Sequence, residues 1–198
     1  MLVKMKKIII AGAPRSGKTT LAKKVFSNYP YNWIQDDNLN CAIQRMYIKY
    51  MAENDGKGEY TIYLNALTEI QNYVLEKYFY FSINDYMYEG IILDTHRLSM
   101  EVLKEYENEG CIVIVLGCAN ITTDEFFENT RIHDTPYDRT YHLGNYRLHM
   151  ELESCIELSK EYKKDCEKLG LTYIETSHNR KESLEKAYQI IKEKIEQS

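Results

Sequence analysis

One short stretch limits the possible folds more than any other part of the chain. Residues Gly12–Thr19, GAPRSGKT, match the pattern G-x-x-x-x-G-K-[ST] at every fixed position. The apolar run KIIIAG, residues 7–12, leads into this stretch, and apolar side chains with helical spacing follow it at Leu21, Ala22 and Val25. A strand, a glycine-bracketed turn and a helix in this order predict the first unit of an α/β domain.

The residue types in this stretch suit the binding of a nucleoside triphosphate. Glycines let the backbone curl so that successive N–H groups point at phosphate oxygens, and the N-terminus of the following helix adds its positive dipole end. Lys18 can reach the β- and γ-phosphates, and the Thr19 hydroxyl can coordinate Mg²⁺. We therefore expect ATP and Mg²⁺ as cofactors. The expected ATP-binding residues are Gly12, Ala13, Pro14, Arg15, Ser16, Gly17, Lys18, Thr19 and Thr20.

The rest of the chain alternates between apolar runs and helical periodicity. The candidate strands are residues 7–12, 31–35, 90–94, 111–117 and 171–176. Three of them lack polar alternation, as strands covered on both faces of a parallel sheet do. Helical spacing follows the first strand, begins again at Arg147, and closes the chain after residue 180. This pattern predicts a three-layer α/β sandwich with helices on both faces of a parallel sheet.

Two long segments interrupt this alternation, and we expect residues 1–198 to form a single domain that includes both. Residues from about 38 to 88 have mostly helical periodicity and many tyrosines, which indicates a helical insertion. Residues from about 118 to 146 follow the fourth strand, and a connection of that length in a compact domain is often a functional lid.

Acidic residues end two of the predicted strands. Asp94 ends GIILD and is the expected second Mg²⁺ ligand beside Thr19, although an aspartate there could also cap the next helix. Asp36 and Asp37 follow the second strand, where a carboxylate can orient an acceptor hydroxyl and take its proton. We expect Asp36 to be catalytic and Asp37 to support it, with the reverse assignment and helix capping both open.

Several arginines are candidates for binding anions. Arg97 and Arg45 are the expected substrate-binding arginines, with solvated surface positions as the alternative. In the lid segment and directly after it, Arg131, Arg139 and Arg147 could neutralise charge that builds on a transferred phosphoryl group, or form salt bridges with the acidic residues around them.

These motifs resemble those of P-loop kinases of the nucleoside and nucleotide kinase-like group, which includes the adenylate, gluconate and shikimate kinases. DTHRLS, residues 94–99, is similar to the stretch after the same strand in some adenylate kinases, and the Asp36-Asp37 pair resembles that of hydroxyl-directed kinases. The resemblance implies a five-stranded sheet in the order 2-3-1-4-5, a helical acceptor lobe at 38–88 and a lid at 118–146. It also implies that the loop before the last helix, with His178, Asn179 and Arg180, contacts the base. The chain lacks the D-G-F-P-R stretch of typical adenylate kinases.

Composition narrows the possible partners. A net charge of −5 argues against nucleic acid as the main partner, and the absence of a long apolar run argues against a membrane. Five scattered cysteines predict reduced thiols and a cytoplasmic protein. We expect a small-molecule phosphate acceptor, such as a nucleoside, a nucleotide or a similar hydroxylated compound. A nucleotide-dependent regulator, a kinase for a macromolecular acceptor, a monomer and a homodimer all stay open.

Overall fold

A computed structural model describes residues 6–38, 41–42, 45 and 89–197. The predicted insertion at 38–88 lies almost wholly outside these residues. The five strands are β1 (Lys6–Gly12), β2 (Tyr31–Gln35), β3 (Gly90–Thr95), β4 (Ile112–Gly117) and β5 (Tyr173–Glu175). The helices are α1 (Lys18–Phe26), α4 (Met100–Asn108), α5 (Thr123–His133), the short 3-10 helix η2 (Arg139–His142), α6 (Asn145–Leu169) and α7 (Arg180–Glu196).

The strands form one parallel sheet in the order β2-β3-β1-β4-β5, which confirms the predicted fold class. β5 is shorter than the predicted strand at 171–176, because only Tyr173–Glu175 pair with β4. The register places Ile10 beside Asp94 and Gly12 beside Leu116. The carboxyl ends of β1, β3 and β4 therefore meet at the same edge of the sheet.

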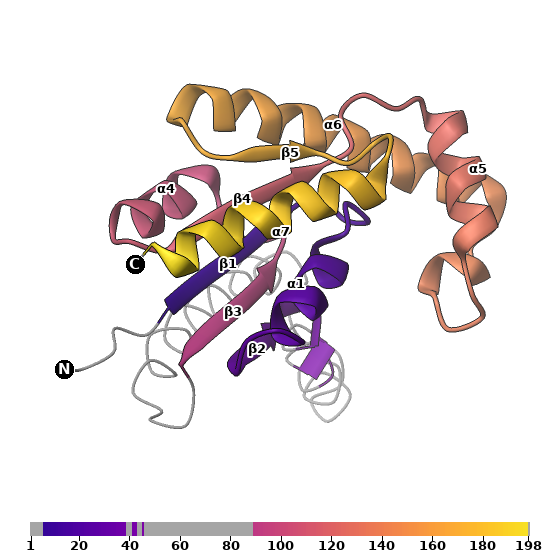
Figure 1. Ribbon diagram of the computed structural model, residues 1–198. Coiled ribbons are helices and arrows are strands. Elements are labelled where there is room, and N and C mark those ends of the chain that lie inside the picture. The colour runs from indigo at the N-terminus through magenta and orange to yellow at the C-terminus, as the bar shows by residue number, and fades with distance from the viewer. Residues whose placement is uncertain (1–5, 39–40, 43–44, 46–88, 198) are drawn as a thin grey trace, which may run out of the picture.

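Helices cover both faces of the sheet, as Figure 1 shows. Alternate side chains of β1 point to opposite layers: Ile8 and Ile10 pack with α1 and α7, whereas Ile9 and Ala11 pack with α4 and α6. Each isoleucine buried in this way contributes roughly 1.5–3 kcal/mol. The central strands are therefore packed on both faces by apolar layers.

The segment predicted as a lid begins after β4 and contains α5 and η2. Thr122 and Glu125 form a capping box that starts α5, and Phe126 of α5 packs against Leu148 and Leu152 of α6. Figure 1 shows α5 standing beyond the carboxyl ends of the strands. The segment therefore lies at the edge of the sheet where the phosphate loop, Gly12–Thr19, is found.

All five cysteines lie in the described part of the chain, and each is a free thiol. Cys155 and Cys166 belong to apolar clusters, as their helical spacing among leucines predicts. No helix within the described ranges has the length and apolar character needed to span a membrane.

Candidate active site

The phosphate loop has a backbone that only glycine adopts easily at its two ends. Gly12 has a φ of +141° and Gly17 a φ of +100°. A Cβ atom on Gly12 would lie 2.0 Å from the carbonyl oxygen of Leu116, so β4 approaches the loop too closely for any side chain. The Ala13 N–H donates to that same carbonyl oxygen at 3.1 Å. The fixed glycines of the motif are thus explained by the left-handed backbone and by the neighbouring strand.

Lys18 and Thr19 begin α1 and point to different partners. The Lys18 ammonium donates to the carbonyl oxygen of Ala13 at 2.9 Å, inside the phosphate loop. Burial lowers the pKa of Lys18, and the negative charges of Asp94 and Asp37 oppose that shift. The Thr19 hydroxyl donates to Asp94 Oδ2 at 2.7 Å. Because this pair supplies a hydroxyl and a carboxylate oxygen, it fits the hard oxygen ligands that Mg²⁺ prefers.

Burial raises the pKa of Asp94, while the Thr19 hydroxyl and the Lys18 charge oppose the shift. Its side chain lies at the end of β3, so the strand holds the carboxylate directly behind the first turn of α1. A cation nearby would favour the ionised carboxylate. The structure therefore brings together the predicted metal ligands Thr19 and Asp94.

The two aspartates after β2 have different surroundings. Asp36 is buried: its Oδ2 accepts a hydrogen bond from the Thr95 hydroxyl at 2.7 Å and lies 3.4 Å from Nε of Arg97. Burial raises the pKa of Asp36, and the Thr95 hydrogen bond is the main opposing influence. The side chain of Asp37 is 75% exposed and lies 3.6 Å from Nδ1 of His96. Of the two carboxylates, only Asp37 reaches the cavity beside the phosphate loop.

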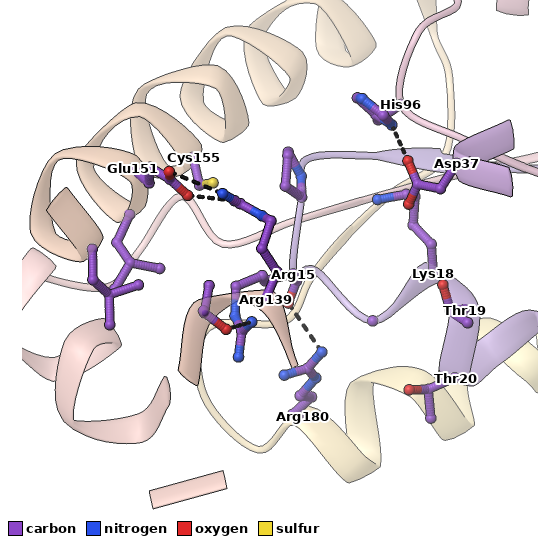
Figure 2. A pocket seen from close by; sticks show the side chains of 15 residues that line it. Arg15, Lys18, Thr19, Thr20, Asp37, His96, Arg139, Glu151, Cys155 and Arg180 are labelled. Carbon is purple, nitrogen blue, oxygen red and sulfur yellow. Dashed lines mark hydrogen bonds and ion pairs between the residues drawn. The ribbon is translucent and has the colours of Figure 1, made fainter. Parts of the chain in front are cut away.

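This cavity has a volume of about 410 Å³ and lies between the phosphate loop, the residue after β3, and the lid segment. Figure 2 shows Lys18, Asp37 and His96 on one side of it and Glu151 on the other. Arg139 of η2 also lines it and forms a two-pronged ion pair with Glu151 of α6. One cavity thus contains the lysine of the phosphate loop, an exposed carboxylate and a lid arginine.

The other two predicted lid arginines lie elsewhere. Arg131 donates to the carbonyl oxygens of Thr140 and Leu143 at 3.1 and 2.7 Å, so it fastens η2 to α5. The Arg147 side chain is 71% exposed and lies 3.4 Å from Glu151 one helical turn further along α6. Neither of them lines the cavity beside the phosphate loop. Arg45 is an exposed helical residue, and most of its sequence neighbours lie outside the described residues.

A second cavity, of about 450 Å³, lies between α5 and the loop that joins β5 to α7. Ser177, His178 and Asn179 line it, which is where the resemblance places contacts to the base. Arg15 and Arg180 line both cavities. Arg180 donates to the carbonyl oxygen of Arg15 at 3.0 Å. Two cationic side chains therefore lie where the two cavities meet.

The sequence analysis did not assign His96 or Glu151 to the site, although both line the first cavity. Burial and the nearby Arg97 charge lower the pKa of His96, which favours a neutral imidazole next to Asp37. The signal for His96 was its place two residues after Asp94, at the carboxyl end of a parallel strand. For Glu151 the signal was its spacing of four residues from Arg147 on one helix.

Comparisons with known proteins identify the fold. No protein-family model matches the sequence, and no curated protein sequence matches it. Among solved structures, a shikimate kinase from Bacteroides thetaiotaomicron matches 97% of this chain and 99% of its own, with a TM-score of 0.54 and 15% identity. TT1252 from Thermus thermophilus matches 95% of this chain and 97% of its own, with a TM-score of 0.58 and 15% identity. A gluconokinase from Sinorhizobium meliloti 1021 matches 96% of this chain and 93% of its own, with a TM-score of 0.51 and 13% identity. The chain has the nucleoside and nucleotide kinase-like P-loop fold.

Proposed function

From this fold and the cavity beside the phosphate loop, we propose that the protein is a kinase that transfers the γ-phosphoryl group of ATP to a small hydroxylated metabolite. One observation carries the proposal. Lys18, Asp37 and Arg139 line the same cavity, and the Thr19–Asp94 pair lies directly beside Lys18. These are the cation, the carboxylate, the lid arginine and the metal ligands that phosphoryl transfer to a hydroxyl uses.

On the donor side, the N–H groups of the phosphate loop and the start of α1 would hold the β- and γ-phosphates. The Lys18 ammonium would leave the carbonyl oxygen of Ala13 and donate to phosphate oxygens instead. Thr19 and Asp94 would hold Mg²⁺, which when bound neutralises phosphate charge and orients the γ-phosphate. Arg180 and the lining of the second cavity would hold the rest of the nucleotide.

On the acceptor side, the exposed Asp37 carboxylate would accept a hydrogen bond from the acceptor hydroxyl and take its proton as the new P–O bond forms. His96, held beside it, would orient the carboxylate. Asp36 would act behind the site by fixing Thr95 and Arg97. This assigns the catalytic role to Asp37 and the supporting role to Asp36, the reverse of the preferred expectation from sequence.

On the lid side of the cavity, Arg139 would stabilise the negative charge of the transition state. Arg139 pairs with Glu151, and its guanidinium lies in the same cavity as Lys18. A transferred phosphoryl group, with charge spread over its equatorial oxygens, would compete with Glu151 for this guanidinium.

The test is ADP release with ATP and Mg²⁺, measured against nucleosides, nucleoside monophosphates, sugars and small hydroxy acids, with shikimate and gluconate among them. We expect one acceptor class to raise ADP release strongly over the rate without acceptor. Lys18→Ala is the matched control and should abolish this release while the far-UV circular dichroism spectrum stays unchanged. A flat acceptor profile with intact ATP binding, or full activity in Lys18→Ala, would contradict the proposal.

A further inference from the structure

The phosphate loop contains one non-glycine residue with a left-handed backbone. Arg15 occupies one of the variable positions of the pattern, yet its φ is +63°, in the left-handed region. A glycine would adopt this conformation without strain, whereas an arginine pays a conformational cost there. Such a residue persists where its side chain makes compensating contacts.

The Arg15 side chain makes those contacts with the lid segment. One of its terminal nitrogens donates to Asp134 Oδ1 at 2.6 Å, and the other donates to the Thr140 hydroxyl. The Thr140 hydroxyl donates in turn to the same Asp134 oxygen at 2.9 Å. The Asp134 side chain is only 1% exposed and that of Arg15 is 28% exposed, so this is a partly buried, charge-assisted contact. We call Arg15, Asp134 and Thr140 the clasp.

The clasp fixes the short helix that carries the lid arginine. Asp134 follows the last residue of α5, and Thr140 is the second residue of η2, directly after Arg139. Arg131 binds the carbonyl oxygen of Thr140 from the α5 side, while Arg15 binds its hydroxyl from the phosphate-loop side. Thr140 is 4% exposed and is held from both directions. Arg139 is thereby kept at the wall of the cavity that Lys18 lines.

We infer that Arg15 is a positioning residue that couples the phosphate loop to the lid and sets the place of Arg139 for phosphoryl transfer. This inference rests on the proposed function for its catalytic part. The clasp joins the loop that would hold the donor phosphates to the helix that would neutralise charge on the transferred group. A displacement of about 1 Å at such a group can lower a rate roughly 100-fold, so rigid coupling between the two is valuable.

The first arm of the test is kinetic and uses the full chain. Arg15→Gly suits the left-handed backbone and removes the guanidinium, and Asp134→Asn keeps the shape of the other partner. For each we expect kcat to fall about 10- to 100-fold while the KM for ATP changes less than about threefold. Because both changes open the same clasp, kcat of the double variant should be at most about twofold lower than kcat of the less active single variant. Lys160→Ala, which removes an exposed ion pair with Glu157 on α6, is the control and should keep kcat.

The second arm needs no activity. In hydrogen exchange of the nucleotide-free protein, amides of residues 139–143 should exchange at least about tenfold faster in Arg15→Gly than in wild type. In Lys160→Ala their exchange rates should equal those of wild type. Unchanged exchange in Arg15→Gly would overturn the clasp. If the wild type shows no acceptor-dependent ADP release, the proposed function fails, and the exchange arm alone then decides whether Arg15 holds η2.

Three kinetic outcomes would overturn the inference. One is a kcat in Arg15→Gly within about twofold of wild type. Another is a multiplicative loss in the double variant, which would mean that Arg15 acts on the nucleotide and not through Asp134. The third is full activity in Arg15→Lys, because a lysine keeps the charge but cannot reproduce the planar two-pronged contact. We expect Arg15→Lys to recover only part of the lost kcat.

Discussion

Two neighbouring aspartates after β2 show how much a one-residue step changes the chemistry of a carboxylate. The Asp36 side chain is 2% exposed and is fixed by Thr95 and Arg97, whereas Asp37 is open to the cavity that contains Lys18. A buried carboxylate is a poor proton acceptor for a substrate that it cannot reach. An exposed carboxylate beside the phosphates can accept the proton of an acceptor hydroxyl.

The matched substitutions Asp37→Asn and Asp36→Asn separate these roles. In Asp37→Asn we expect kcat to fall roughly 100-fold, with ATP affinity and thermal stability kept, because only proton transfer is lost. In Asp36→Asn we expect a loss of about 1–3 kcal/mol in the free energy of unfolding, because a buried hydrogen-bonded contact to Thr95 and Arg97 is weakened. Steady-state kinetics, ATP titration and urea unfolding of both variants test this.

The opposite pattern would contradict the assignment. A kcat loss confined to Asp36→Asn, with Asp37→Asn fully active, would return the catalytic role to Asp36. Loss of ATP affinity in Asp37→Asn would move that residue to the donor side. In the double Asn variant we expect transfer to be lost and ATP binding largely kept.

His96 should make stability depend on pH. Burial and the Arg97 charge lower its pKa in the folded protein below the ordinary value of 6.5. As the pH falls through that value, the unfolded chain takes up the proton first, so the free energy of unfolding decreases. Urea unfolding should therefore show that the free energy of unfolding decreases less between pH 7.5 and pH 5.5 in His96→Gln than in wild type. An equal decrease in the free energy of unfolding in the two proteins would contradict the lowered pKa of His96.

At the scale of elements, the three candidate arginines of the lid segment and of α6 differ in their contacts. Arg131 binds backbone carbonyl oxygens of η2 and its flank, Arg147 lies on the exposed surface of α6, and Arg139 lines the cavity. The sequence does not distinguish the three, because each is an arginine among acidic residues in or directly after the predicted lid segment. Only the fold of η2 against α6 distinguishes them, and that fold depends on contacts between residues far apart in the chain.

Arg139→Ala and Arg147→Ala form the corresponding pair of tests. Both substitutions remove a cation that binds Glu151, but only Arg139 lines the cavity. We expect Arg139→Ala to lower kcat roughly 100- to 1,000-fold, as loss of a group that stabilises transition-state charge does. Arg147→Ala should change kcat less than about twofold and stability by about 0–1 kcal/mol, because the pair that it breaks is exposed. Comparable kinetic losses in the two variants would contradict the assignment of Arg139.

At the scale of the whole molecule, the parts that could be predicted from sequence are those with local signals. The apolar runs and their spacing gave the strands, and the fixed residues of the phosphate loop gave the start of α1. The pairing of Thr19 with Asp94 followed from a general property of parallel sheets, whose carboxyl ends meet at one edge. The clasp of Arg15 with Asp134 had no such signal, because its partners are 119 residues apart and their meeting depends on how α5 packs on α6.

Ligand-linked stability tests the donor site in the intact protein without any acceptor. A ligand that binds only the folded state at 100 times its Kd adds about 2.7 kcal/mol to the free energy of unfolding. For a chain of this size that corresponds to a rise in Tm of about 5–10 °C with saturating ATP and Mg²⁺. We expect the rise to disappear in Lys18→Ala, because the buried ammonium that would bind the β- and γ-phosphates is gone.

Asp94→Asn is the more specific variant, since it should separate the effect of the nucleotide on Tm from the effect of the metal. If Asp94 holds Mg²⁺ beside Thr19, the variant keeps a small rise in Tm with ATP alone, and added Mg²⁺ no longer enlarges it. Calorimetry or dye-based melting at fixed ATP with varied Mg²⁺ measures the difference. An equal Mg²⁺ effect in wild type and in Asp94→Asn would remove Asp94 from the metal site. An equal rise in wild type and in Lys18→Ala would mean that the nucleotide binds outside the phosphate loop, and the kinase mechanism would then lose its donor site.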